Sequence, residues 1–179
     1  MKGGDQMRRA LGAVVLGAVL AAGVPALASA QARGYVKLGG GVGMPMGDFG
    51  DHFDMGWIAQ VAGGIGSGMI GGRINGTYGQ NGAKDVDGNV KIMGAMGDLV
   101  LSPSMGDGGV APYFLGGAGF QSIKNGESDT KFGWNVGAGV NLKLGGLAVY
   151  LEGRYLSIQT EGESSTMIPI TAGIRIGGN

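Results

Sequence analysis

The chain has 179 residues, with 13 basic and 13 acidic side chains, so its formal net charge is zero and there is no electrostatic reason to expect a nucleic-acid partner. The absence of cysteine excludes disulfides and thiolate metal sites. Glycine is abundant, at 42 residues, but it follows no Gly-X-Y period, which excludes collagen.

The first 30 residues have the pattern of a cleavable signal peptide. A basic start, MKGGDQMRR, precedes the apolar run ALGAVVLGAVLAAGV, which is short for a membrane-spanning helix of about 20 residues. Ala28, Ser29 and Ala30 then form a small-x-small cleavage site, and Ala30 to Ala32 fit almost as well. We therefore expect a signal peptide over residues 1–30 and an exported domain over residues 31–179. The alternative is an N-terminal membrane anchor.

The exported region contains strand-like segments of about ten residues, separated by clusters of Gly, Asp, Asn and Ser, and it has no convincing helical stripe. The eight expected strands are Tyr35–Met44, Trp57–Gly66, Met69–Gly79, Val90–Leu101, Ala111–Ile123, Phe132–Leu144, Leu147–Ile158 and Thr166–Gly177.

Apolar and polar residues alternate along these segments, most clearly over Phe132–Leu144 and Thr166–Gly177. Successive side chains of a strand point to opposite faces, so each strand has one apolar face and one polar face. The fourth strand is ambiguous, because Asp98 shares the parity of Ile92 and Met96. A bulge at one of its glycines would switch the phase.

The connections between the segments alternate in length. A long stretch follows the first segment, and QNGAKDVDGN, KNGESDTK and QTEGESS are also long. The pairs SG and GG are very short, and SPSMGDGGV is intermediate. Tight turns on one side and long loops on the other are typical of a transmembrane barrel, in which both ends of the strand series would fall on the short-turn side.

The polar face indicates which side of the barrel is inside. A soluble barrel needs many Lys and Glu side chains on its exterior, whereas this polar face is mostly Gly, Asn and Thr with isolated charges. An eight-stranded barrel has a lumen just wide enough for side chains to fill. We therefore expect an all-β fold, an eight-stranded antiparallel up-and-down transmembrane β-barrel with its apolar face in lipid. A soluble secreted ligand-binding barrel is the alternative.

Charged residues on the inward parity form the candidate site. Glu152 is expected to reach one or more of the basic residues across the lumen. A paired polar plug that fixes strand register is the favoured interpretation, because small barrels have filled interiors, and an ion or proton path is the other. The predicted lumen cluster is Lys37, Arg73, Glu152, Arg154 and Arg175, with Gln60 on the same parity and Asp98 added if the fourth strand is in phase.

Aromatic residues near strand ends on the apolar parity predict belts at the membrane interface. They are Trp57, Tyr78, Phe132, Trp134 and Tyr155.

No residue set indicates catalysis, a metal site or a cofactor. His52, the single histidine, lies among aspartates in DFGDHFDMG, where a solvated loop is favoured over a cation site, and it has no obvious serine partner. The stretches GGGVG and GGAG are not followed by a helix, as a phosphate-binding loop requires. We therefore expect no enzyme activity.

The segments PYFLGGAG, FGWNVGAGV, AVYLEGRYL and IPITAGIRIG resemble the small outer-membrane β-barrel domain family of Gram-negative bacteria, which includes opacity-type proteins and the barrel of outer-membrane protein A. The resemblance implies an outer-membrane location, lipid around the barrel and the barrel-insertion machinery as a partner during biogenesis. The aromatic last residue usual in the family is replaced by Asn179. The implied function is a structural or surface-interaction role, in which exposed loops meet an extracellular ligand. A narrow channel for small solutes is the alternative.

Overall fold

The structure is a computed structural model that describes residues 32–47, 55–82, 89–103, 109–125, 127–159 and 164–178. The predicted signal peptide (residues 1–30), His52 and Asn179 lie outside the described residues. Among the described residues there is no helix long and apolar enough to cross a membrane.

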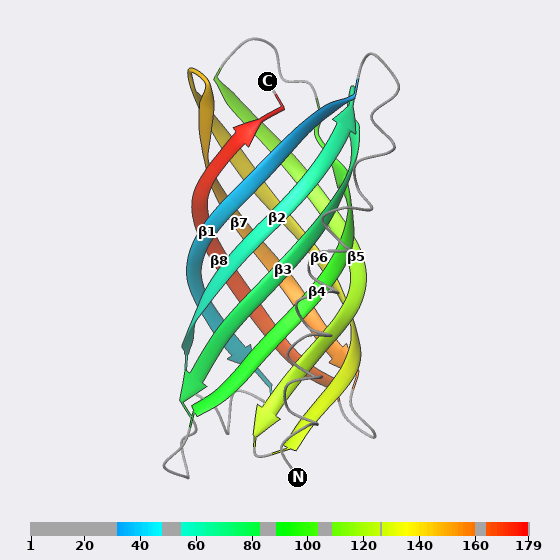
Figure 1. The fold of residues 1–179 in the computed structure, drawn as a ribbon, viewed down its shortest axis with the longest axis vertical. Helices are drawn as coiled ribbons and strands as arrows, with labels where there is room; N and C mark the ends of the chain where they lie inside the picture. The colour runs from blue at the N-terminus through cyan, green and yellow to red at the C-terminus, as the bar shows by residue number, and fades with distance from the viewer. Residues whose placement is uncertain are drawn as a thin grey trace, which may run out of the picture. The chain divides into compact units, whose positions relative to one another are not determined.

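Antiparallel strands close into a single barrel in which each strand pairs with its neighbours in sequence and β1 pairs with β8 (Figure 1). All eight expected strands are confirmed, with ends that differ by a few residues. The strands are β1 (Arg33–Met46), β2 (Gly56–Ser67), β3 (Ile70–Gly82), β4 (Asn89–Leu101), β5 (Val110–Asn125), β6 (Glu127–Leu144), β7 (Leu147–Gln159) and β8 (Ser164–Gly177).

Strand β4 contains no bulge. Its pairing with β3 runs without a break from Ile70↔Leu101 to Gly82↔Asn89. Ile92, Met96 and Asp98 are all buried, so they share the inward face. The change of phase considered for this strand does not occur, and apolar side chains also face the lumen here.

One expected loop is wrong. The segment KNGESDTK was expected to form a long loop, but β5 continues to Asn125 and β6 begins at Glu127, and these two residues pair. The remaining connections at that end, called the loop end here, are residues 47–55, 83–88 and 160–163. Residues 68–69, 102–109 and 145–146 connect strands at the opposite end, called the turn end, where β1 begins and β8 ends (top of Figure 1).

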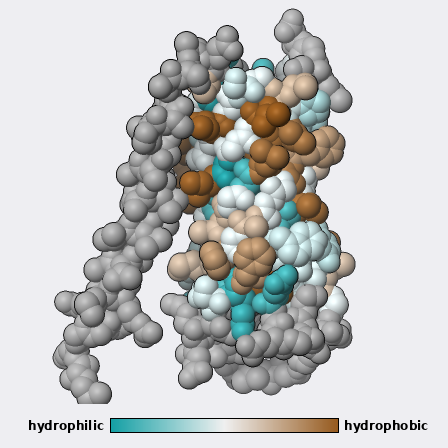
Figure 2. Space-filling view, turned by 90° about the vertical axis from the view of Figure 1, so that its right-hand side faces the viewer, coloured by the Kyte–Doolittle hydropathy of each residue, from teal (hydrophilic) through white to brown (hydrophobic). Residues whose placement is uncertain are grey.

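The outside of the barrel is apolar. On β7, Val149, Leu151 and Tyr155 are exposed, whereas Tyr150 and Glu152 are buried. In Figure 2, apolar side chains gather toward the upper half of the face in view. Exposed apolar surface of this extent is typical of a membrane or protein contact. The same outward pattern appears on the other strands, with exposed residues such as Val36, Leu38, Val42, Val61, Ile74, Leu99, Phe114, Val136, Leu142, Ile170, Ile174 and Ile176.

Inward glycines let large side chains cross the lumen. A Cβ atom built on Gly139 would lie closer than van der Waals contact to the hydroxyl and ring of Tyr113, and 2.7 Å from the Leu151 carbonyl oxygen. A Cβ atom built on Gly153, on the outer face of the neighbouring strand, would have open space around it. Glycine at position 139 therefore makes room for Tyr113 in the interior.

Candidate functional site

Glu152 lies in the lumen and is completely buried. Its Oε2 atom accepts hydrogen bonds from the Lys37 ammonium at 3.0 Å, from Arg73 Nη1 at 2.6 Å and from the Tyr113 hydroxyl at 2.7 Å. The three donors come from β1, β3 and β5. Two of these bonds have a charged donor as well as a charged acceptor, which makes them stronger than neutral hydrogen bonds.

The other carboxylate oxygen of Glu152 is also fully engaged. Arg154, two residues along the same strand and on the same face, donates to Oε1 from Nε at 2.7 Å, and its Nη2 lies 2.5 Å from the same oxygen. Gln60 Nε2 donates to Oε1 at 3.3 Å, and Arg73 Nη2 does so at 3.4 Å. The carboxylate therefore has partners on both oxygens, as a buried charge requires.

Arg73 joins Glu152 to a second buried carboxylate. Its Nε and Nη2 atoms lie 3.1 Å and 2.8 Å from Asp98 Oδ2. The other oxygen of Asp98 accepts a hydrogen bond from Asn135 Nδ2 at 2.9 Å. The guanidinium of Arg73 thus spans both acidic groups, a task suited to its rigid fork of donors.

The network reaches every strand of the barrel. Thr171 on β8 donates to Gln60 Oε1 at 3.0 Å, which adds the last strand to the chain of hydrogen bonds. We call this set the lumen network: Lys37 (β1), Gln60 (β2), Arg73 (β3), Asp98 (β4), Tyr113 (β5), Asn135 (β6), Glu152 and Arg154 (β7) and Thr171 (β8).

Positive charge exceeds negative charge within the lumen network, which contains three basic residues and two acidic ones. The excess is partly balanced by aromatic rings. The Lys37 ammonium lies 3.8 Å from the ring centre of Tyr150 and 4.5 Å from that of Tyr113. A cation over an aromatic face is attracted by the ring quadrupole, and the attraction is stronger when the site is dry.

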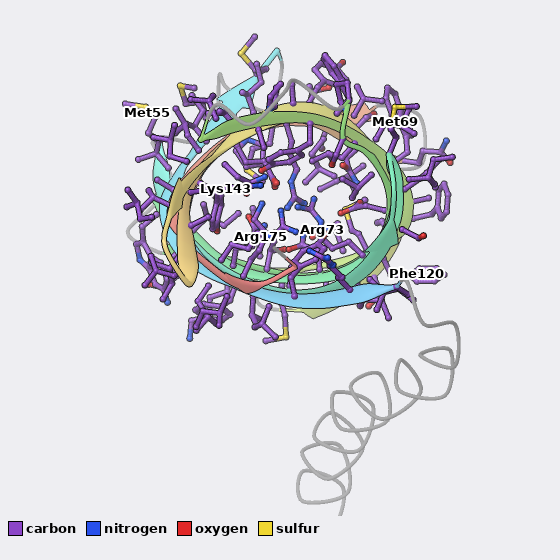
Figure 3. All side chains as sticks on the ribbon, turned by 90° about the horizontal axis from the view of Figure 1, so that it is seen from above. Met55, Met69, Arg73, Phe120, Lys143 and Arg175 are labelled. Carbon is purple, nitrogen blue, oxygen red and sulfur yellow. The ribbon has the colours of Figure 1, made fainter. Side chains whose placement is uncertain are left out.

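Arg175 was predicted to belong to the cluster around Glu152, and the structure places it elsewhere. Its guanidinium lies 4.2 Å from the ring centre of Tyr35 and donates to the Gly178 carbonyl at 3.4 Å. Both contacts are near the turn end of the barrel, where β8 finishes. Figure 3 shows Arg73 and Arg175 inside the ring of strands, and Met55, Met69 and Phe120 outside it.

An apolar layer fills the lumen on the loop side of the network. It consists of buried side chains that pack together near the loop ends of β2, β4, β7 and β8. A cavity of only about 10 Å³ lies between this layer and the network, beside Gln60, Asn135 and Arg154. That is about the volume one water molecule needs, so this space holds at most a single water. The layer comprises Ile58, Ile92, Met96, Leu156, Ile158 and Met167.

The five predicted interface aromatics all lie on the outer parity of the loop half. Trp57 packs against Tyr78 with ring centres 5.6 Å apart, and Trp134 packs against Tyr155 at 5.7 Å. Phe132 contacts Phe120, which the sequence analysis did not include, at 6.2 Å. Their role at a membrane interface stays a prediction.

Three members of the network were not assigned to the site from sequence. Tyr113 shares its parity with Leu115 and therefore looks like an apolar position. Asn135 and Thr171 lie on the polar faces of the segments Phe132–Leu144 and Thr166–Gly177, but nothing in their own strands indicates Asp98 and Gln60 as partners. Counting the polar side chains, including tyrosine, on the inward face of every strand would identify Tyr113, Asn135 and Thr171.

Comparison with known proteins matches residues 14–176 to the family described as outer membrane protein beta-barrel domain. No curated protein sequence matches the chain. Among solved structures, Neisserial surface protein A is 16% identical with a TM-score of 0.65, over 80% of this chain and 96% of that one.

Two other solved structures are similar over comparable lengths. A major outer membrane protein from Thermus thermophilus is 14% identical with a TM-score of 0.57, over 82% of this chain and 99% of that one. Ail, the attachment invasion locus protein of Yersinia pestis, is 14% identical with a TM-score of 0.51, over 82% and 99%. At these identities the likeness establishes the fold.

The family match and the fold agree with the distribution of side chains. A closed barrel with an apolar exterior and a buried polar interior is suited to lipid, because every strand edge is paired. The protein is an outer-membrane β-barrel, and the soluble secreted barrel considered from the sequence is excluded. The chain belongs to the outer membrane protein beta-barrel domain family.

Proposed function

We propose that this protein is a closed, non-enzymatic outer-membrane barrel that conducts no solute and acts as a rigid scaffold for its loop-end connections. The observation that carries the proposal is the lumen network, in which Glu152 is bound by donors from five strands. We infer that this cluster, which ties strands together across the lumen, blocks a continuous water path at that level.

The apolar layer supports the same function. An ion that passed the network would next meet a layer made mostly of apolar side chains, including Ile58 and Leu156, with the Gln121 amide beside them. Moving an unpaired charge into such surroundings costs several kcal/mol. A narrow channel would require both the network and the apolar layer to rearrange.

Planar-bilayer recording tests the closed state. The full mature protein, refolded and checked for membrane insertion by flotation with vesicles, is expected to give no single-channel steps. A general porin inserted in the same bilayers is the positive control. Steady steps from the wild-type protein would refute the closed state and favour the narrow channel.

The second part of the proposal concerns the loop end. Connections 47–55, 83–88 and 160–163 leave the barrel there, and the paired strands β5 and β6 extend to Asn125 and Glu127. The longest connection, residues 47–55, lies at this end, and the long connections of such barrels face outward, so these segments would meet extracellular ligands or surfaces. Ail, whose name describes attachment, has the same fold, and a surface-contact role for this chain is proposed from that likeness. The barrel-insertion machinery is the partner proposed during biogenesis.

Epitope insertion tests the orientation. A tag placed at residue 126 is expected to be labelled by antibody on intact cells, whereas the same tag between residues 145 and 146 is expected to be labelled only after the outer membrane is permeabilised. Labelling of the second tag on intact cells would reverse the proposed orientation.

A further inference from the structure

A cavity of about 60 Å³ lies in the turn-end half of the lumen. One water molecule needs roughly 10–15 Å³ of such volume, so the cavity has room for a few waters or for one small polyatomic ion. Its lining includes Arg33 and Gly68, which are exposed, and it is therefore reached from the turn end.

The walls of this cavity are basic. Arg33, Lys37, Arg73 and Arg175 line it, and no Asp or Glu is among its lining residues. The hydroxyl groups of Tyr35, Ser102 and Tyr113 and the amide of Asn141 complete the polar part of the lining. A concave site with one sign of charge and low-dielectric walls concentrates ions of the opposite sign.

The basic residues of the lining differ in how they are balanced. Lys37 and Arg73 form the inner wall and are paired with Glu152. Arg175 has no carboxylate partner among the described residues, where its contacts are the Tyr35 ring and the Gly178 carbonyl. The positive charge of Arg175 is therefore available to a ligand in the cavity.

Two buried polar atoms in the lining also lack partners among the described residues. They are Arg175 Nε, a donor, and Asn141 Oδ1, an acceptor. Buried polar atoms are almost always hydrogen-bonded, so each such atom calls for a water or an ion. A hydrogen phosphate ion would suit both, because it has oxygens that accept from the guanidinium and a hydroxyl that donates to the amide oxygen.

We propose that the turn-end cavity binds a small tetrahedral oxyanion of the phosphate class, held by Arg175 and Arg33 at the entrance, with Lys37 and Arg73 behind it. Guanidinium groups match phosphate oxygens in geometry and keep their charge at all physiological pH values. The turn end of such barrels faces the periplasm, so the ion would enter from that side.

The test is titration of the refolded full mature protein with inorganic phosphate in phosphate-free maltoside micelles, followed by calorimetry. Saturable binding at one site is expected. Arg175→Gln is expected to weaken binding at least tenfold, whereas Lys91→Gln, which removes an exposed positive charge from the outer face near the loop end, is expected to leave it unchanged. Heat-modifiability on a gel checks that each variant is folded.

If Arg175→Gln does not fold, Arg33→Gln at the exposed entrance replaces it, with an expected loss of at least threefold. Absence of saturable binding by the folded wild-type protein, or equal binding by wild type and the arginine variant, would overturn the proposal. Glycerol phosphate is titrated in parallel: tighter binding than inorganic phosphate assigns the site to a lipid headgroup, and weaker binding assigns it to a free ion.

Discussion

Arg73 and Glu152 face each other across the whole width of the lumen, from β3 and β7, with 2.6 Å between Nη1 and Oε2. In a closed ring of eight strands these two are as far apart in strand order as possible. Each side chain is essentially buried. The barrel is therefore braced through its centre by a charged pair.

Glu152→Gln is expected to lower the free energy of unfolding by about 3–5 kcal/mol, because Lys37, Arg73 and Arg154 lose their shared counter-charge in a buried site. The midpoint temperature of the heat-modifiable gel shift, measured in lipid vesicles, should fall. Asp98→Asn should have a smaller effect, since Arg73 keeps its pairing with Glu152. An unchanged midpoint for the glutamate variant would disprove the bracing role.

Removing a cation together with the carboxylate should recover part of the loss. The double variant Glu152→Gln, Lys37→Met is expected to lose less free energy of unfolding than the two single variants lose in total. The difference, which is the coupling free energy, is expected to be about 0.5–3 kcal/mol. Urea unfolding in lipid vesicles measures all four corners of the cycle. Lys91→Gln combined with Glu152→Gln should be additive, and equal coupling in both cycles would contradict a direct pairing of Lys37 with Glu152.

Gly139→Ala is expected to destabilise the barrel by about 1–3 kcal/mol, because the new methyl group would overlap the Tyr113 ring and force the interior to shift. Gly153→Ala, on the outer face, is the matched control and should change the stability by less than about 0.5 kcal/mol. Urea unfolding of the two variants side by side decides the point. Similar stabilities would mean that the interior is loosely packed.

An arginine on the outer face should be costly in proportion to its depth in the bilayer. Leu151 is exposed on the outer face, next to Glu152 in the chain. Leu151→Arg is expected to lower the free energy of unfolding by about 2–4 kcal/mol in lipid vesicles. Leu147→Arg, next to the turn at residues 145–146, should cost about 0–1 kcal/mol. Equal costs at the two positions would argue that Leu151 does not lie near the bilayer centre.

The alternation of side chains was enough to predict the barrel and the inward direction of Lys37, Arg73, Glu152 and Arg154. These residues lie on strands whose two faces differ strongly in polarity. Because side chains alternate between the faces with a period of two, each residue can be assigned to only one face. The fourth strand was harder, because its inward face carries Ile92 and Met96 beside Asp98. Apolar side chains there belong to the layer that fills the loop half of the lumen, which a rule of polar inside and apolar outside does not anticipate.

Sequence could not predict which inward residues meet. Contact across the lumen depends on the tilt and stagger of the strands, which set the height of each residue along the barrel. Arg175 pairs in register with Lys37, yet its side chain extends toward Gly178 at the turn end and not toward Glu152. The segment KNGESDTK is rich in turn-forming residues, yet its residues 124–125 and 127–131 belong to β5 and β6, which continue to pair beyond the length that crosses a bilayer.

The lumen network also bears on how the barrel is assembled. In chain order, Glu152 lies on the seventh strand, after four of its hydrogen-bond partners on earlier strands. Thr171 on the eighth strand is the last member of the lumen network. In an incomplete sheet these charged side chains would be unpaired. Closure of β8 onto β1 would therefore form many of the hydrogen bonds and ion pairs of the lumen network at once. Such a barrel should close in one cooperative step, without a stable seven-stranded intermediate.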